Sequence, residues 1–125
     1  MQQRALRLLC AVLLALITVV ASARPNTRIG DIWVSELPPE ARVTLQHIDR
    51  GGPFPYRRDG VTFQNRENRL PAQPQNFYRE YTVPTPGTTN RGARRIVTGD
   101  QPPSLFYYTD DHYRSFARIH RQQHK

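Results

Sequence analysis

The feature that most constrains this chain is the position of its only cysteine. Cys10 lies within LLCAVLLALITVV, an apolar run that follows two arginines and precedes the small residues ASA. This order is typical of a secretory signal peptide, and the run falls short of the roughly 20 apolar residues that an uncleaved membrane anchor requires. We therefore predict a signal peptide over residues 1–23 and one exported domain over residues 24–125, which must fold without a disulfide.

The charge of the predicted domain limits the kinds of partner that it is expected to bind. Removal of Arg4 and Arg7 with the signal peptide leaves 16 basic against 10 acidic residues, a net charge of +6. A chain of about 100 residues suffices for one small domain with one core. An exported basic domain favours an anionic partner, which is a nucleic acid, an acidic glycan or a membrane surface. Charge alone does not choose among these three.

Residues 35–52 form the one segment with a helical pattern. Its paired prolines suit a first helical turn, and the glycines at 51 and 52 suit a helix end. Within the segment, apolar residues recur at spacings of three and four, which places them on one stripe of a helix. The residues of this stripe are Leu37, Ala41, Leu45 and Ile48.

Short β-branched and aromatic runs bounded by turn residues predict strands in the rest of the domain. One N-terminal helix followed by such strands predicts an α+β fold, in which the helix packs on one face of a small twisted antiparallel sheet. The other face of the sheet is then free to carry a site. The predicted strands are residues 32–34, 61–64, 77–83, 93–99, 104–109 and 114–119.

Several kinds of catalytic site are poorly supported by the sequence. The histidines are far apart or near the C-terminus, and the predicted domain has neither a thiol nor an H-E-x-x-H motif. It also has no glycine-rich phosphate loop and no serine in a nucleophile-elbow context. We therefore predict neither a metal nor a cofactor, and a nucleophilic or metal hydrolase is disfavoured.

Glu80 is the first polar residue that stands out, since it lies in the middle of the aromatic run FYREYTV. The two-residue period of a strand places it on the same face as Tyr78 and Thr82. An ordinary exposed strand residue is the alternative interpretation.

A second unusual group is RGARRIV, in which Arg91, Arg94 and Arg95 lie close together before a predicted strand. Arg95 shares a strand face with Val97, whereas Arg94 has the opposite orientation. The alternative is an edge strand protected by its charge. The third residue, His112 in the turn DDHY, has an ordinary loop histidine as its alternative.

Together these groups fit one reaction class, phosphodiester transfer without a metal. A base takes the proton of a hydroxyl nucleophile, and an acid gives a proton to the leaving oxygen. Guanidiniums hold the phosphoryl oxygens and stabilise the charge of the transition state. RNA carries the nucleophile as its own 2′-hydroxyl, which DNA lacks, so the combination favours RNA as the substrate.

Six stretches of the chain occur in an order and at spacings that match a known family. The chain resembles the bacterial guanyl-specific ribonucleases, the barnase-like microbial ribonucleases, and especially their short secreted actinobacterial-type members. The resemblance extends from about Ile32 to Ile119 and implies the fold of one helix on an antiparallel sheet. The matching stretches are LPPEA (37–41), GPFPY (52–56), DGVTFQNRE (59–67), YREYTV (78–83), RGARRI (91–96) and DHY (111–113).

The resemblance implies catalytic roles for four residues. Glu80 corresponds to the general base and His112 to the general acid, whereas Arg91 and Arg95 correspond to the arginines that hold the scissile phosphate. Arg94 is left with a surface or supporting role.

The resemblance also implies a guanine site in FQNRE. The Glu67 carboxylate would accept the N1–H and N2–H donors of guanine, and adenine would be rejected because its edge differs. Aromatic rings of the family contact the base face and the phosphate. The remaining residues implied are the backbone N–H groups of Gln64, Asn65 and Arg66, and the rings of Phe63 and Tyr113.

The reaction implied is cleavage of single-stranded RNA 3′ of guanosine through a 2′,3′-cyclic phosphate, by a secreted monomer. A barstar-like protein inhibitor is an implied partner, and no stable membrane association is expected once the signal peptide is removed. One alternative is a non-catalytic RNA-binding relative, which has no need for both an acid and a base. The other is a cationic membrane-active protein, which requires a basic amphipathic helix that this chain lacks.

Two departures from the family pattern carry expectations. Short members often join their chain ends by a disulfide, but Trp33 and the Gln122–Gln123 region stand where the cysteines are expected. We expect lower stability, or compensation by packing of Trp33. Arg57 and Arg58 lie near the implied path of the phosphates, and they are expected to strengthen binding of the polymer at low salt.

Overall fold

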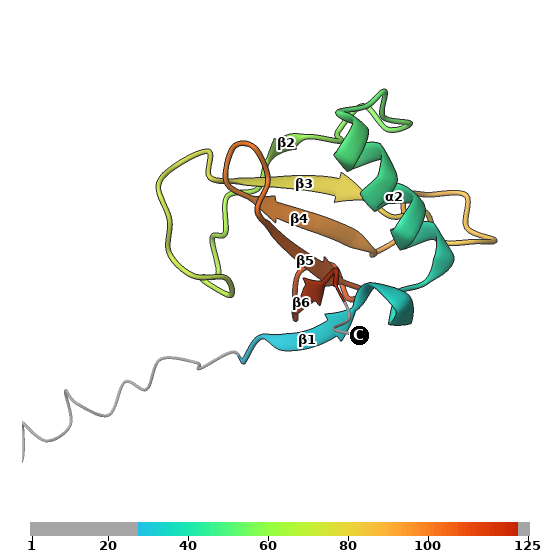
Figure 1. Cartoon of the computed structure of the whole chain (residues 1–125). Coiled ribbons are helices and arrows are strands. Elements are labelled where there is room, and N and C mark those ends of the chain that lie inside the picture. Colours follow the sequence, from blue (N-terminus) through green and yellow to red (C-terminus); the bar gives the residue numbers. More distant parts are fainter. Residues whose placement is uncertain (1–27, 123–125) are drawn as a thin grey trace, which may run out of the picture.

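The computed structural model describes residues 28–122, so the predicted signal peptide lies outside the described residues. One helix packs on one face of a six-stranded sheet, which confirms the predicted α+β class (Figure 1). The strand order across the sheet is β1-β6-β5-β4-β3-β2. The elements are β1 (Gly30–Trp33), a 3-10 turn (Val34–Glu36), α2 (Pro39–Arg50), β2 (Val61–Thr62), β3 (Tyr78–Thr82), β4 (Arg95–Gly99), β5 (Leu105–Thr109) and β6 (Ala117–His120).

Helix α2 is shorter than the predicted 35–52. Pro38 has extended backbone angles (φ −54°, ψ 148°), so helical geometry begins only at Pro39, whose missing N–H costs nothing in the first turn. At the other end Gly51 takes the left-handed conformation (φ 73°), and its N–H donates to the Ile48 carbonyl. The helix therefore ends at Arg50, one residue before the predicted glycine stop.

The edge of the sheet formed by β1 corrects the expectation of a purely antiparallel arrangement. Strand β1 pairs in parallel with β6, with Gly30 opposite Ala117 and Trp33 opposite His120. The remaining strand pairs are antiparallel. A parallel pair requires a long crossover connection, and here helix α2 and strands β2 to β5 lie between the two partners in the chain.

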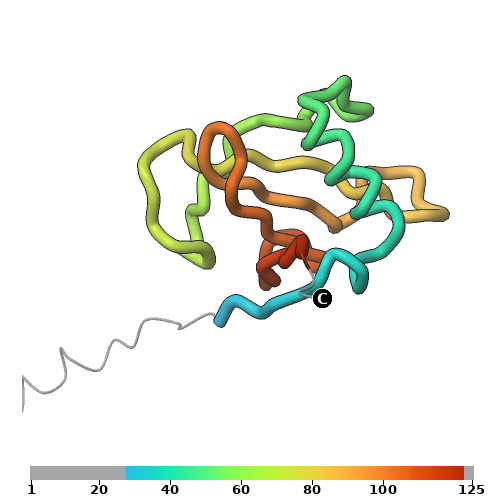
Figure 2. Tube along the Cα trace, viewed as in Figure 1, coloured from blue at the N-terminus to red at the C-terminus, as the bar shows by residue number. Residues whose placement is uncertain are grey.

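Strands β2 and β6 differ from their predicted bounds because of the loops that adjoin them. Strand β2 has two residues rather than four, since the chain turns into the loop of residues 63–77, which projects past one end of the sheet (Figure 2). Strand β6 begins at Ala117 rather than 114, since hydrogen bonds from Ser115 to Asp111 hold the preceding residues in a turn.

Alternation along the strands divides the protein into two apolar clusters, one on each face of the sheet. The cluster beneath the helix contains Leu37, Ala41, Leu45, Ile48, Tyr81, Val83, Ile96, Tyr108 and Ile119. The cluster on the opposite face contains Leu70, Tyr78, Val97, Tyr107 and Phe116. The predicted alternation in β3 and β4 is therefore confirmed, and the second face also carries the buried polar residues Glu80, Thr82, Arg95 and Thr109.

Polar contacts join the two ends of the described chain. His120 Nε2 lies 2.7 Å from Asp31 Oδ1, and Arg121 Nη1 donates to Asp49 Oδ1 at 2.7 Å. The Trp33 ring lies 5.3 Å from the His120 ring but remains 36% exposed. Packing of Trp33 is therefore only part of what joins the ends. The expected loss of stability stays a prediction.

Candidate active site

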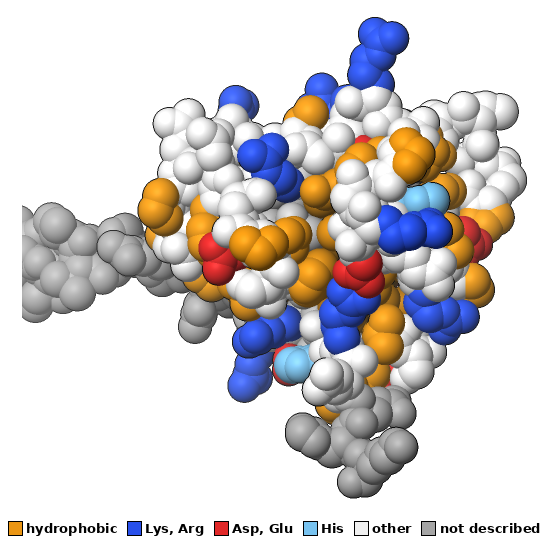
Figure 3. Space-filling model, turned by 45° about the horizontal axis from the view of Figure 1, so that its top comes forward, with side chains coloured by type: hydrophobic (Ala, Val, Ile, Leu, Met, Phe, Trp, Pro, Cys, Tyr) orange, Lys and Arg blue, Asp and Glu red, His pale blue; other side chains and the backbone are white. Residues whose placement is uncertain are grey.

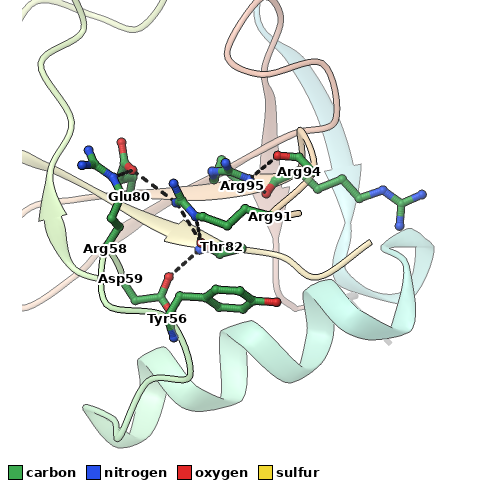
Figure 4. A network of polar contacts seen from close by, with 9 residues as sticks. Tyr56, Arg58, Asp59, Glu80, Thr82, Arg91, Arg94 and Arg95 are labelled. Atoms are coloured by element: carbon green, nitrogen blue, oxygen red, sulfur yellow. Dashed lines mark hydrogen bonds and ion pairs between the residues drawn. The ribbon is translucent and has the colours of Figure 1, made fainter. Parts of the chain in front are cut away.

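Glu80 lies in the middle of β3, on the sheet face opposite the helix, and is only 7% exposed. Its Oε1 atom lies 3.7 Å from Arg91 Nη2 and 3.8 Å from Arg58 Nε (Figure 4). A buried carboxylate is costly unless cations or hydrogen bonds compensate its charge. The two guanidiniums on either side of Glu80 supply that compensation.

Arg91 reaches Glu80 from the loop before β4. Thr82 Oγ1 accepts hydrogen bonds from Arg91 Nε (3.1 Å) and Nη2 (2.9 Å), which fixes the plane of the guanidinium. The adjacent Gly92 is left-handed (φ 67°), and a Cβ there would lie 2.5 Å from Thr85 Oγ1. The glycine of the RGARR motif is thus needed for the loop to pack this closely.

Arg95 is the most deeply buried cation of the site, at 2% exposure. Its Nη1 donates to the carbonyls of Gly92 (3.0 Å) and Arg94 (2.7 Å). Its Nε is buried and has no hydrogen-bond partner among residues 28–122. The Arg94 side chain extends away from this cluster, as its position in the strand predicted (Figure 4).

Tyr113 connects the base and the arginines. Burial, and then the negative charge of Glu80, raise the pKa of Tyr113 to about 12, while Arg95 opposes the rise. The phenol therefore stays protonated at neutral pH, close to the charges of Glu80 and Arg95. Its ring stacks on Phe63, with centroids 4.8 Å apart.

His112 lies beside this cluster, in the turn between β5 and β6. Its backbone N–H donates to the Ala93 carbonyl at 3.0 Å, which joins the turn to the arginine loop. Its ring lies against Tyr113, with centroids 4.9 Å apart, and the residue is exposed. The structure thus gathers the four predicted catalytic residues around one face of the sheet.

Asn65 fixes the conformation of the predicted guanine loop. This residue is left-handed (φ 53°), and its side chain both donates to the Leu70 carbonyl (2.9 Å) and accepts the Leu70 N–H (3.1 Å). A cavity of about 110 Å³ adjoins Phe63 and Asn65. The exposed residues at the tip of this loop are Gln64, Arg66 and Glu67. None of them makes a hydrogen bond or an ion pair with Glu80 or His112 in the described part of the chain.

The sequence analysis did not foresee two residues that support the site. Asp59 accepts the Thr82 N–H at Oδ1 (2.7 Å) and the Tyr56 N–H at Oδ2 (3.1 Å), which fastens the loop that carries Arg58 to β3. Thr82 orients Arg91. The alternation of β3 placed Thr82 on the correct face, but nothing in the sequence indicated the long-range bond from Asp59.

On the face of the protein shown in Figure 3, Lys and Arg side chains lie among hydrophobic ones, with few acidic side chains between them. Residues 28–122 contain no group of three or more His, Cys, Asp or Glu side chains placed to hold a metal ion. No helix in that range is long and apolar enough to cross a membrane.

A buried carboxylate among arginines on one face of a sheet suits acid–base chemistry at a phosphate ester. Comparison with known proteins identifies the family to which the chain belongs. Residues 21–120 match the model of the ribonuclease family. The chain is 57% identical over 91 residues to guanyl-specific ribonuclease Sa3 of Kitasatospora aureofaciens, covering 73% of this chain and 64% of that protein. It is 54% identical over 90 residues to guanyl-specific ribonuclease Sa of the same organism, covering 72% of this chain and 93% of the relative.

Solved structures agree with these relatives. A structure of ribonuclease Sa2, from a set of complexes with mononucleotides, has a TM-score of 0.72 and 44% identity, and covers 76% of this chain and 97% of that one. A structure of Sa2 with guanosine-2′-cyclophosphate has a TM-score of 0.71 and 44% identity, and covers 77% and 100%. The chain belongs to the microbial guanyl-specific ribonuclease family.

Proposed function

We propose that this protein is a secreted, guanyl-specific endoribonuclease that cleaves single-stranded RNA 3′ of guanosine. The observation that carries the proposal is the buried Glu80 carboxylate, held between Arg58 and Arg91 and close to the Tyr113 phenol. A ring of donors around one carboxylate suits a base that acts beside a phosphate. The names of the relatives and the guanosine ligand of Sa2 support the specificity.

In the first step of the proposed reaction, Glu80 takes the proton of the guanosine 2′-hydroxyl. The 2′-oxygen then attacks the adjacent phosphorus, forming a 2′,3′-cyclic phosphate, while His112 donates a proton to the leaving 5′-oxygen. Arg91, Arg95 and the protonated Tyr113 phenol hold the phosphoryl oxygens. In the second step His112 takes a proton from water as the water oxygen attacks the phosphorus. The bond from phosphorus to the 2′-oxygen breaks, Glu80 returns a proton to that oxygen, and a 3′-phosphate results. These groups account for the charge and the protons without a metal.

Recognition of guanine is assigned to the loop that the Asn65 side chain stabilises. Its exposed tip presents Glu67 for the two edge donors of the base, and the N–H groups of residues 64–66 for its acceptors. Phe63, stacked on Tyr113, offers a surface on which the base can lie. We further propose that the mature protein acts as a monomer without stable membrane association, and that a barstar-like inhibitor binds the same cleft.

The proposal is tested with GpA, GpC, ApC and UpC in EDTA, using mature wild type, Glu80→Ala and His112→Ala. We expect metal-free cleavage only after guanosine, with a cyclic intermediate, and a loss of about 100- to 10,000-fold in either variant. Circular dichroism confirms that each variant is folded. A folded wild type that binds these dinucleotides but does not cleave them would instead be a non-catalytic RNA-binding relative.

A further inference from the structure

The turn between β5 and β6 has an unusual backbone at the two residues assigned to the chemistry. His112 and Tyr113 are both left-handed, with φ of 55° and 70°. Side chains with a Cβ rarely adopt this region, and two consecutive residues in it are costly. Such a turn persists only where surrounding contacts enforce it.

Asp111 supplies those contacts. Its Oδ1 accepts hydrogen bonds from the Ser115 N–H (2.9 Å) and the Thr109 hydroxyl (2.8 Å), and its Oδ2 accepts the Ser115 hydroxyl (2.5 Å). Burial by itself would raise the pKa of Asp111, but these hydrogen bonds outweigh it and lower the pKa. The carboxylate is therefore charged at neutral pH and closes the turn from Thr109 to Ser115.

The same network ties the turn to the phosphate-binding side of the site. Thr109 is buried at the end of β5, directly opposite Arg95 in the register of β4 and β5. Its hydroxyl oxygen accepts the Tyr113 N–H at 3.1 Å, while the His112 N–H donates to Ala93 at 3.0 Å. The position of His112 relative to Arg95 is thus set by the bond to Ala93 and by the bonds that lead from Tyr113 through Thr109 to Asp111.

We propose that Asp111 is a positioning residue for the general acid: it enforces the left-handed turn that places the His112 imidazole at the leaving oxygen. This inference rests on the proposed function, in which His112 is the acid. Because Asp111 acts mainly through His112, its loss should matter most where the leaving oxygen needs a proton. A general stabilising role would lower activity on every substrate alike.

The test compares two leaving groups in the variant Asp111→Asn. GpA releases an alkoxide, which needs a proton, whereas guanosine 3′-(4-nitrophenyl phosphate) releases a nitrophenolate, which does not. We expect kcat on GpA to fall about 10- to 100-fold, a part of the whole contribution of an acid, with KM nearly unchanged. The nitrophenyl ester should be cleaved at close to the wild-type rate. Equal losses on both substrates would overturn the proposal.

Two controls complete the test. Asp110→Asn removes the same charge from the neighbouring exposed residue and should leave both substrates at the wild-type rate. In a His112→Ala background, Asp111→Asn should add no further loss on GpA, since the two residues act as one unit. Additive losses would show that Asp111 acts independently of His112, and would also overturn the proposal.

A milder variant keeps the proposal testable if Asp111→Asn fails to fold. Ser115→Ala removes one bond to Oδ2, keeps the carboxylate, and should show a smaller loss with the same dependence on the leaving group. Failure of the underlying function is distinguishable, since wild type would then not cleave GpA or His112→Ala would cleave it normally. Either result would remove the acid on which Asp111 is proposed to act.

Discussion

The two faces of the sheet bury their residues for opposite purposes, and adjacent residues of β4 show the contrast. Ile96 faces the helix at 0% exposure and packs in the apolar cluster that includes Leu45 and Tyr81. Arg95 faces the other way at 2% exposure, with two carbonyls as partners and an Nε that has none in the described chain. Burial of Ile96 stabilises the protein, whereas burial of Arg95 holds a positive charge in the candidate active site.

The difference has a simple physical origin. Apolar surface gains free energy when it leaves water, but a buried cation loses hydration that only a full set of partners restores. On the site face the buried charge also serves the proposed reaction, in which Arg95 holds a phosphoryl oxygen. We therefore expect substitutions of the apolar residues that face the helix to alter stability, and substitutions of the buried charged residues on the site face to alter activity.

The largest effect is expected for Arg95→Lys. A lysine ammonium lacks the planar fork with which a guanidinium holds two phosphoryl oxygens. We expect kcat/KM on GpA to fall about 100- to 1,000-fold, the usual consequence of losing a donor to developing charge. Steady-state kinetics on the folded variant measures this. A loss below tenfold would show that Arg95 is a structural cation and that the contrast between the faces is wrong at this position.

Ile96→Ala is the matched change on the other face. Truncation of a fully buried isoleucine should lower the free energy of unfolding by about 2–5 kcal/mol. Urea unfolding measures this loss, and kcat/KM of the folded fraction on GpA should stay near wild type. A large fall in kcat/KM without loss of stability would contradict the division of roles between the faces.

A third prediction concerns alkaline pH and Tyr113. Burial and the charge of Glu80 raise the pKa of Tyr113 to about 12 from an ordinary value of 10.0. Between these values the folded state binds more protons than the unfolded state, so this residue makes stability fall as pH rises. In Tyr113→Phe the decline of unfolding free energy between pH 10 and 12 should be shallower, as urea unfolding at several pH values would show. An identical decline would indicate that Tyr113 titrates normally.

The smallest effect is expected for Arg58→Ala, which removes an exposed partner of Glu80. If Arg58 also contacts a phosphate of bound RNA, the slope of log Kd against log salt for a single-stranded oligonucleotide should fall by about 0.7. Arg57→Ala is the control, since it removes the same charge from the same exposed turn, and Arg57 has no ion pair in the described chain. Equal slopes for the two variants would make Arg58 a general surface cation.

Much of this arrangement was predictable because it depends on local patterns. The apolar stripe from Leu37 to Ile48 placed the helix, and the period of two placed Glu80 with Thr82 on one strand and Arg95 with Val97 on another. The register that brings Glu80 and Arg95 to the same face came only from the structure. Predicted element ends were less accurate, since proline geometry at Pro38 and side-chain bonds around Asp111 decided them. The ion pair between Arg58 and Glu80 joins residues far apart in sequence, and no local pattern carries that information.

The sequence by itself determined the α+β class, the alternation of side chains along β3 and β4, and a domain that folds without disulfides. It did so because strand and helix periods and the cysteine count are properties of neighbouring residues. Only the tertiary structure decided the parallel pairing of β1 with β6, the bond from Asp59 that fastens the Arg58 loop to β3, and the left-handed turn at His112. These features depend on which distant groups satisfy one another's hydrogen bonds and charges once the chain is packed.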